Sequence, residues 1–128
     1  AGAVVLAARA ALRAGAGLVK LIVAPESVAA VQAAVPEAIA VAWPQEEAAA
    51  RREVGEWAHG ILLGPGMGPG GRPLVERLLS VTRAPAVLDA DALNAFASDA
   101  TALEELLAER AALLTPHPGE LARLSGGT

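Results

Sequence analysis

The regular alternation of short apolar runs with longer helix-like segments is what most restricts the folds open to this chain. The runs are rich in valine, isoleucine, leucine and alanine, and segments of about 8–14 residues with helical spacing separate them. Such an order predicts βαβ units and a mainly parallel sheet with helices on its faces. Strands are expected at 18–24, 38–43, 60–64, 86–90 and 112–115, and helices at 3–14, 26–35, 45–58, 71–82, 92–97, 101–110 and from about Pro118.

The predicted fold class is therefore α/β, with a mainly parallel sheet in a layered arrangement. Because the predicted strands are almost wholly apolar instead of alternating, we expect both faces of the sheet to be covered. The predicted helix at 45–58 has a charged face formed by Glu46, Glu47, Arg51, Arg52 and Glu56. The chain opens on a helix and stops soon after another begins, which predicts a fragment of a larger domain.

Composition excludes several classes of function. The chain has no cysteine and therefore no disulfide or thiolate metal site. Its formal net charge is −4 and its basic residues are scattered, whereas a nucleic-acid surface needs a basic stripe. No apolar run approaches the ~20 residues of a membrane-spanning helix, and no signal-peptide pattern opens the sequence. We expect a cytoplasmic protein that binds neither nucleic acid nor membrane.

The loop after the third predicted strand reads GPGMGPGG and spans residues 64–71. Its glycines let backbone N–H groups approach an anion closely, and a helix N-terminus follows. Gly66, Gly68 and Gly71 also satisfy the dinucleotide pattern G-x-G-x-x-G, and Asp89 follows roughly 20 residues on. A ligand-binding loop is favoured over a plain turn, because so many glycines cost stability.

Two aspartates surround the end of the next predicted strand, in VLDADALN. Asp89 ends the strand, where a buried carboxylate needs a partner or a ligand. Asp91 is either the N-cap of the following helix or a second carboxylate of a site. Asn94 lies one helical turn later and could join Asp91 on one face. Such groups can orient hydroxyls, hold Mg²⁺ through water or accept protons. The spacing of the residues does not distinguish between these three roles.

The loop after the last predicted strand, TPHPGE, places His117 between two prolines. The prolines restrict the backbone on both sides, which favours a binding side chain held in fixed geometry over a structural histidine. Glu120 falls in the first turn of the next helix, where a carboxylate favours the helix dipole. His59 is expected to be a helix C-terminal residue, and two distant histidines offer no metal-ligand spacing. If the three strands are neighbours, all three loops lie at one edge of the sheet.

Four motifs in this order resemble the NAD(P)H-hydrate dehydratase family: RAGAGLVKL, GPGMG, LDADALN and LTPHPGE. The resemblance covers about residues 2–124 and implies a ribokinase-like α/β/α fold. It implies a lyase that returns hydrated, redox-inactive NADH or NADPH to the active cofactor. The cosubstrate would be ADP or ATP with Mg²⁺. The ring hydroxyl would be phosphorylated and phosphate would then be eliminated. The sequence does not indicate which of the two nucleotides is used.

The resemblance also implies which residues bind the hydrated dinucleotide. In the family it contacts an alanine near the first helix, the GPGMG loop and the histidine of TPHPGE. Carried over to this chain, these are Ala3, Gly66 with its neighbour Gly68, and His117, and the aspartates of LDADALN would line the same pocket. The predicted substrate-binding residues are therefore Ala3, Gly64, Gly66, Gly68, Asp89, Asp91, Asn94 and His117. The family's catalytic aspartate belongs to a GTGD motif that would lie beyond Thr128, so neither a catalytic residue nor a metal ligand is assigned in this chain.

Residues 1–128 are thus expected to form the first part of one dehydratase domain. Family members continue after TPHPGE with a nucleotide-binding segment and an anion hole, so this part alone is expected to be inactive. The resemblance further implies a homo-oligomer, a tetramer in bacterial relatives, and an epimerase domain that is sometimes fused upstream.

Three other functions stay open. A small-molecule kinase of the ribokinase-like superfamily would share the fold but lack TPHPGE as written here. A Rossmann oxidoreductase using the glycine loop and Asp89 would bind intact NADH without needing ADP or ATP, and it leaves His117 unexplained. A non-catalytic binding protein would be recognised by the absence of nucleotide binding.

Overall fold

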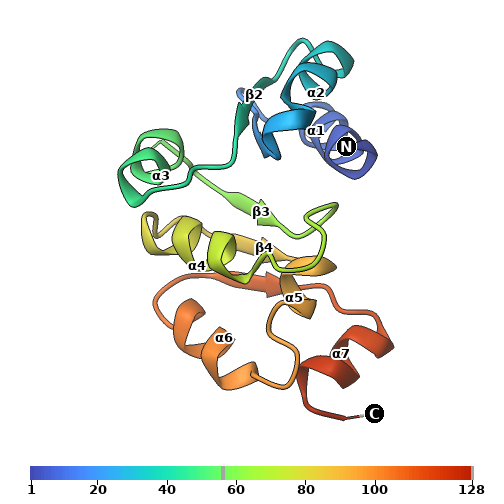
Figure 1. Ribbon diagram of the computed structural model, residues 1–128, viewed down its shortest axis with the longest axis vertical. Helices are drawn as coiled ribbons and strands as arrows, with labels where there is room; N and C mark the ends of the chain where they lie inside the picture. The colour runs from blue at the N-terminus through green and yellow to red at the C-terminus, as the bar shows by residue number, and fades with distance from the viewer. Residues whose placement is uncertain (56, 128) are drawn as a thin grey trace. The chain divides into compact units, whose positions relative to one another are not determined.

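The computed structural model describes residues 1–55 and 57–127. Helices and strands alternate along the chain as the sequence predicts (Figure 1). The chain divides into two compact units, residues 1–43 and 44–128. In chain order the elements are α1 (Gly2–Arg13), β1 (Lys20–Val23), the 3₁₀ turn η1 (Pro25–Ser27), α2 (Val28–Ala34), β2 (Ile39–Ala42), α3 (Glu47–Glu53), β3 (Ile61–Leu63), α4 (Arg72–Ser80), β4 (Ala86–Leu88), α5 (Asp91–Asn94), α6 (Ala100–Leu107), β5 (Ala112–Leu114) and α7 (Pro118–Leu124).

In the first unit, β1 and β2 pair in parallel from Lys20↔Ile39 to Val23↔Ala42. Helix α1 ends where Gly15 takes a φ of +104°, which a residue with a side chain rarely adopts. The side chain of Gln32 ties α2 to the following strand, because its Nε2–H donates to the Ala38 carbonyl at 2.7 Å and its Oε1 accepts from the Ala40 N–H at 3.0 Å.

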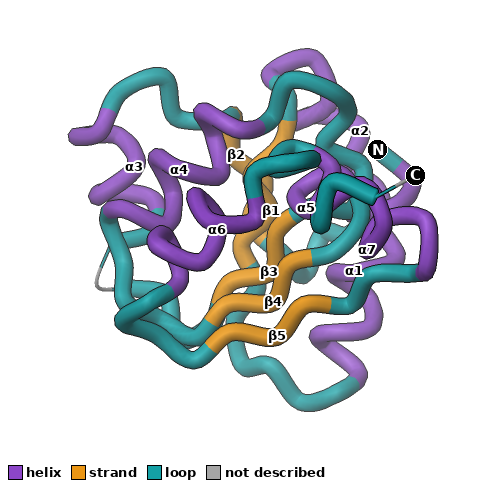
Figure 2. Tube along the Cα trace, turned by 90° about the horizontal axis from the view of Figure 1, so that it is seen from below, coloured by secondary structure: helices purple, strands orange, loops and turns teal. Residues whose placement is uncertain are grey.

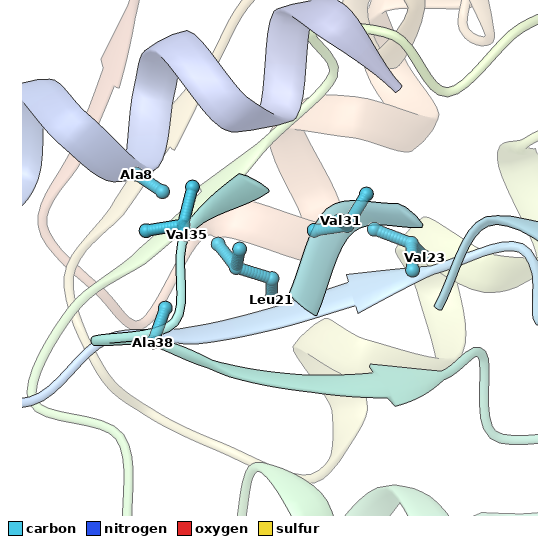
Figure 3. Close-up of a cluster of buried hydrophobic side chains, with 6 residues drawn as sticks. All are labelled: Ala8, Leu21, Val23, Val31, Val35 and Ala38. Atoms are coloured by element: carbon cyan, nitrogen blue, oxygen red, sulfur yellow. The ribbon is translucent and has the colours of Figure 1, made fainter. Parts of the chain in front are cut away.

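The first unit has a core of its own, built from α1, α2 and β1 (Figure 3). Val31 is fully buried, and the other members are no more than 6 % exposed. Burial of each valine or leucine side chain contributes about 1.5–3 kcal/mol, so this small cluster is what holds the helices against the strand pair. Its members are Ala8, Leu21, Val23, Val31, Val35 and Ala38.

In the second unit, the strands stand side by side in the order β3-β4-β5, all parallel (Figure 2). Leu63, Leu88 and Leu114 occupy one row of the register. The ladder continues past the strand ends, because the Asp89 N–H donates to the Leu63 carbonyl and the Thr115 N–H to the Leu88 carbonyl. The loops that follow the three strands therefore leave the sheet at the same edge.

One face of this three-stranded sheet is covered by helices. Figure 2 shows α4, α5 and α6 on the same side of it, and these helices bury Val75, Leu79, Leu93 and Leu103. On the opposite face, Leu62 is 51 % and Leu113 is 59 % exposed within the described residues. The expectation that both faces of the sheet are covered stays a prediction for this unit.

The predicted α/β class with parallel strands is confirmed, with two local corrections. The helix expected at 45–58 is only Glu47–Glu53, because the chain turns at Gly55, whose φ is +23°. His59 therefore lies in an exposed bend and not at a helix C-terminus. Glu56, expected on the charged face, falls outside the described residues. Among the residues described, no helix is both long and apolar enough to span a membrane.

Candidate functional site

The glycine loop between β3 and α4 depends on backbone conformations that favour glycine. Gly64 is buried with a φ of +128°, and a Cβ there would collide with the backbone carbonyl of Asp89. This position therefore allows the loop to pass directly against the end of β4. Further along, Gly66, Gly68 and Gly70 have φ values of +76°, +78° and +78°. Gly71 then forms the N-cap of α4.

Asp91 holds this loop from the neighbouring strand end. Its Oδ2 accepts a hydrogen bond from the Gly68 N–H at 2.8 Å. The alternative that Asp91 is the N-cap of the next helix is wrong, because Ala90 occupies the N-cap and Asp91 is the first residue of α5. A carboxylate that accepts a hydrogen bond from a loop N–H orders that loop. The segment after β4 is therefore linked to the glycine loop after β3.

Asp89 directly follows β4 and has a half-buried side chain. Its carboxylate has no hydrogen-bond partner within residues 1–55 and 57–127, whereas its carbonyl accepts from the Ala92 N–H at 3.1 Å. Ala90, the next residue after Asp89, has a φ of +49° and a ψ of −121°, a conformation that alanine rarely adopts. The Asp89 carboxylate, without a hydrogen-bond partner among the described residues, stays a predicted ligand-binding group.

Asn94 links the second loop to the third. Its Oδ1 accepts a hydrogen bond from Arg123 Nε at 2.9 Å, which joins α5 to α7. The sequence predicts Asn94 beside Asp91 but does not indicate Arg123, because no local pattern reveals a partner 29 positions away.

His117 is the N-cap of α7. Its Nδ1 accepts hydrogen bonds from the N–H groups of Gly119 at 3.0 Å and Glu120 at 3.3 Å. Glu120 Oε2 accepts in return from the His117 N–H at 3.0 Å, which completes a capping box. The fixed geometry expected for His117 is thus present, while its side chain remains 61 % exposed to solvent.

Arg72 anchors the helix that follows the glycine loop. Its guanidinium donates to Glu76 Oε1 and Asp99 Oδ2, both at 2.9 Å, and lies 4.6 Å from the centre of the Phe96 ring. The hydrogen bonds to Glu76 and then to Asp99 raise the pKa of Arg72 above its ordinary value. This cluster, which sequence reasoning missed, fixes the exit of the loop against the segment after α5.

The structure thus brings seven of the eight predicted binding residues to one edge of the β3-β4-β5 sheet: Gly64, Gly66, Gly68, Asp89, Asp91, Asn94 and His117. Ala3 is exposed on α1 in the other unit, so its part in the same site stays a prediction. Among the described residues, no group of three or more histidine, aspartate or glutamate side chains is placed to hold a metal ion.

Comparison with known proteins identifies the family. The sequence profile of the NAD(P)H-hydrate dehydratase family matches residues 1–128. The chain belongs to this family. It is 40 % identical to the bifunctional NAD(P)H-hydrate repair enzyme of Salinibacter ruber over 140 aligned positions, which cover 98 % of this chain and 25 % of that protein. The chain therefore spans about a quarter of the length of the curated relatives it matches.

Solved structures agree with the family assignment. A ribokinase-like superfamily protein from Enterococcus faecalis superposes with a TM-score of 0.82 at 27 % identity, over 98 % of this chain and 44 % of that one. The ADP/ATP-dependent NAD(P)H-hydrate dehydratase from Bacillus subtilis, co-crystallised with ATP/Mg²⁺, gives 0.67 at 26 % identity, over 98 % and 43 %. The fold is ribokinase-like, as expected. These findings favour the dehydratase reading over a Rossmann oxidoreductase or a small-molecule kinase.

Proposed function

We propose that this chain supplies the substrate-binding strand ends of an enzyme that dehydrates hydrated NADH and NADPH with ADP or ATP as cosubstrate. The observation that carries the proposal is the joining of the three loops: Asp91 bonds Gly68, and Asn94 bonds the helix that His117 caps. Membership of the dehydratase family supplies the chemistry that such a site would serve.

Each loop offers a different group to a hydrated dinucleotide. The glycine loop offers backbone N–H groups at close approach, which suit phosphate or amide oxygens. The free carboxylate of Asp89 suits a ring or ribose hydroxyl, because an ionised carboxylate only accepts hydrogen bonds. His117, fixed at the N-terminus of α7, can orient the hydrated ring from the third loop.

The described residues do not by themselves account for nucleotide and Mg²⁺. They contain no metal-ligating group of three side chains, and a single free carboxylate does not make a magnesium site. The proposal therefore assigns substrate binding to this chain and derives no phosphoryl-transfer step from its residues. The choice between ADP and ATP, a homo-oligomeric and tetrameric state, a cytoplasmic location and an attached epimerase domain remain proposals of the same kind.

The test is recovery of reduced nicotinamide absorbance from hydrated NADH by the full-length gene product, with ADP, with ATP or with neither. We expect recovery only when a nucleotide is present. His117→Asn is the informative variant, because asparagine keeps an N-cap while removing the ring. It is expected to lower kcat/KM by about tenfold or more, the effect of one hydrogen bond lost from a bound substrate.

His59→Asn is the matched control, since His59 is exposed and lies outside the three loops. It should leave kcat/KM unchanged. No recovery with either nucleotide, together with binding of intact NADH, would favour the Rossmann alternative. Recovery without any nucleotide would contradict the proposed role of ADP or ATP.

A further inference from the structure

Arg123, in the last turn of α7, is exposed, yet its guanidinium is held in place. Its Nε–H donates to Asn94 Oδ1 at 2.9 Å, and its backbone carbonyl accepts from the Ser98 N–H at 2.8 Å. Side chain and backbone are therefore both tied to the segment that follows β4. An arginine side chain that is already ordered loses less conformational entropy when it binds a ligand.

The guanidinium of Arg123 extends back over the first turn of α7, the direction in which helical side chains point. Gly119 provides the space for it. A Cβ on Gly119 would lie 3.4 Å from Arg123 Nη1 and 2.9 Å from Cε1 of the His117 ring. The guanidinium and the imidazole therefore converge over a residue without a side chain, next to the loop that follows β5.

The charge of Arg123 is not paired with a carboxylate among the residues that the structure describes. Its side-chain hydrogen bond goes to the neutral amide of Asn94, and its Nη1 and Nη2 groups have no acceptor in that part of the chain. Arg72, which follows the glycine loop, is by contrast engaged by Glu76 and Asp99. A guanidinium with two unengaged Nη groups can bind a phosphate through two parallel hydrogen bonds.

The other charged side chains of the three loops make such a cation necessary. Asp89 and Asp91 are both carboxylates, and a dinucleotide brings negatively charged phosphate to the same sheet edge, where like charges repel. We propose that Arg123 binds a phosphate group of the hydrated dinucleotide through Nη1 and Nη2. This inference rests on the proposed function for its ligand, and it adds a phosphate contact on α7 to the three loops.

Equilibrium binding to the full-length protein, without ADP or ATP, tests this contact apart from turnover. Arg123→Gln removes the charge and is expected to raise the Kd for hydrated NADH about tenfold or more, the effect of a lost hydrogen bond to a charged group. Hydrated dihydronicotinamide riboside keeps the ring but has no phosphate, so its Kd should not change. Arg83→Gln is the control and should alter neither Kd, because Arg83 is exposed, pairs with Glu109 and lies outside the three loops.

Hydrated NADPH identifies which phosphate Arg123 contacts. Equal losses of affinity for the hydrates of NADH and NADPH assign the contact to the pyrophosphate, whereas a loss for hydrated NADPH alone assigns it to the 2′-phosphate. Arg123→Lys keeps the charge but not the planar pair of donors, so an intermediate loss is expected. Added salt should weaken binding of hydrated NADH to the wild type more than to Arg123→Gln, because salt screens the lost charge.

The outcomes separate this inference from the proposed function. A folded Arg123→Gln variant that binds both hydrates as tightly as the wild type overturns the phosphate contact, and an equal loss for the riboside does so by indicating a structural role. If that variant does not fold, the same comparison in Arg123→Met decides. A wild type that binds no hydrate overturns the proposed function. Inorganic pyrophosphate is then the probe: weaker binding in the variant supports the phosphate contact, and unchanged or absent binding overturns it.

Discussion

Ala90 is the residue whose backbone departs most clearly from its own preference. Its φ of +49° and ψ of −121° match the first central position of a type II′ turn, and the Ala92 N–H closes that turn on the Asp89 carbonyl. Glycine dominates this position because any Cβ is strained there. The turn sets the direction in which Asp89 and Asp91 leave the strand, so the strain lies within the candidate site.

Replacement of Ala90 by glycine should therefore stabilise the protein. Relief of the backbone strain is expected to outweigh the added entropy of the unfolded chain, for a net gain of about 1 kcal/mol in the free energy of unfolding. Urea denaturation of the two proteins measures the difference. Ala95→Gly is the control and should be destabilising, because Ala95 has an ordinary helical φ of −60°. A loss of stability in Ala90→Gly would show that the alanine is not strained.

Single residues also mark the limit of what the sequence could predict. The proline pair around His117 indicated a constrained side chain, and the histidine is indeed fixed at a helix N-cap. The sequence could not choose between a cap and a site role for Asp91, because the deciding partner is Gly68, 23 positions away. His59 was misplaced because the end of the preceding helix was set by Gly55, a weak local signal.

At the scale of elements, the loop from β3 to α4 is a continuous piece of non-standard backbone. Gly64 begins it against the end of β4, and Arg72 fixes its exit by contacts to Asp99 and Phe96. The glycine pattern in the sequence predicted a special loop correctly. It could not reveal that the first glycine is required for packing against Asp89, since that contact joins two strands.

The glycines of this loop should differ in their tolerance of a side chain. Gly64→Ala places a Cβ against the Asp89 carbonyl and is expected to lower the free energy of unfolding by about 3 kcal/mol or more. Gly68→Ala is the matched comparison. Its φ is also positive, at +78°, but nothing lies within 4 Å of the added Cβ, so a cost of about 1–2 kcal/mol from backbone strain is expected. Equal costs, measured by denaturant unfolding, would contradict the packing role of Gly64.

For the whole molecule, the order of helices and strands and the adjacency of β3, β4 and β5 followed from apolar periodicity and parallel-sheet rules. Which leucines of the strands are exposed in the described part of the chain did not follow. Leu62 and Leu113 are as apolar as Leu63 and Leu88, yet the first two are exposed and the last two buried. The composition of a strand indicates that its side chains favour burial. Which elements pack on the strand depends on the rest of the fold.

We propose that the ends of β3, β4 and β5 form one substrate site. Hydrogen–deuterium exchange of the full-length protein with and without hydrated NADH tests it most directly. We expect slower exchange together in residues 64–71, 89–95 and 115–120, because one ligand would contact or order all three loops, with helix α2 unchanged as the internal reference. Protection confined to one of these segments, or to none, would contradict the claim.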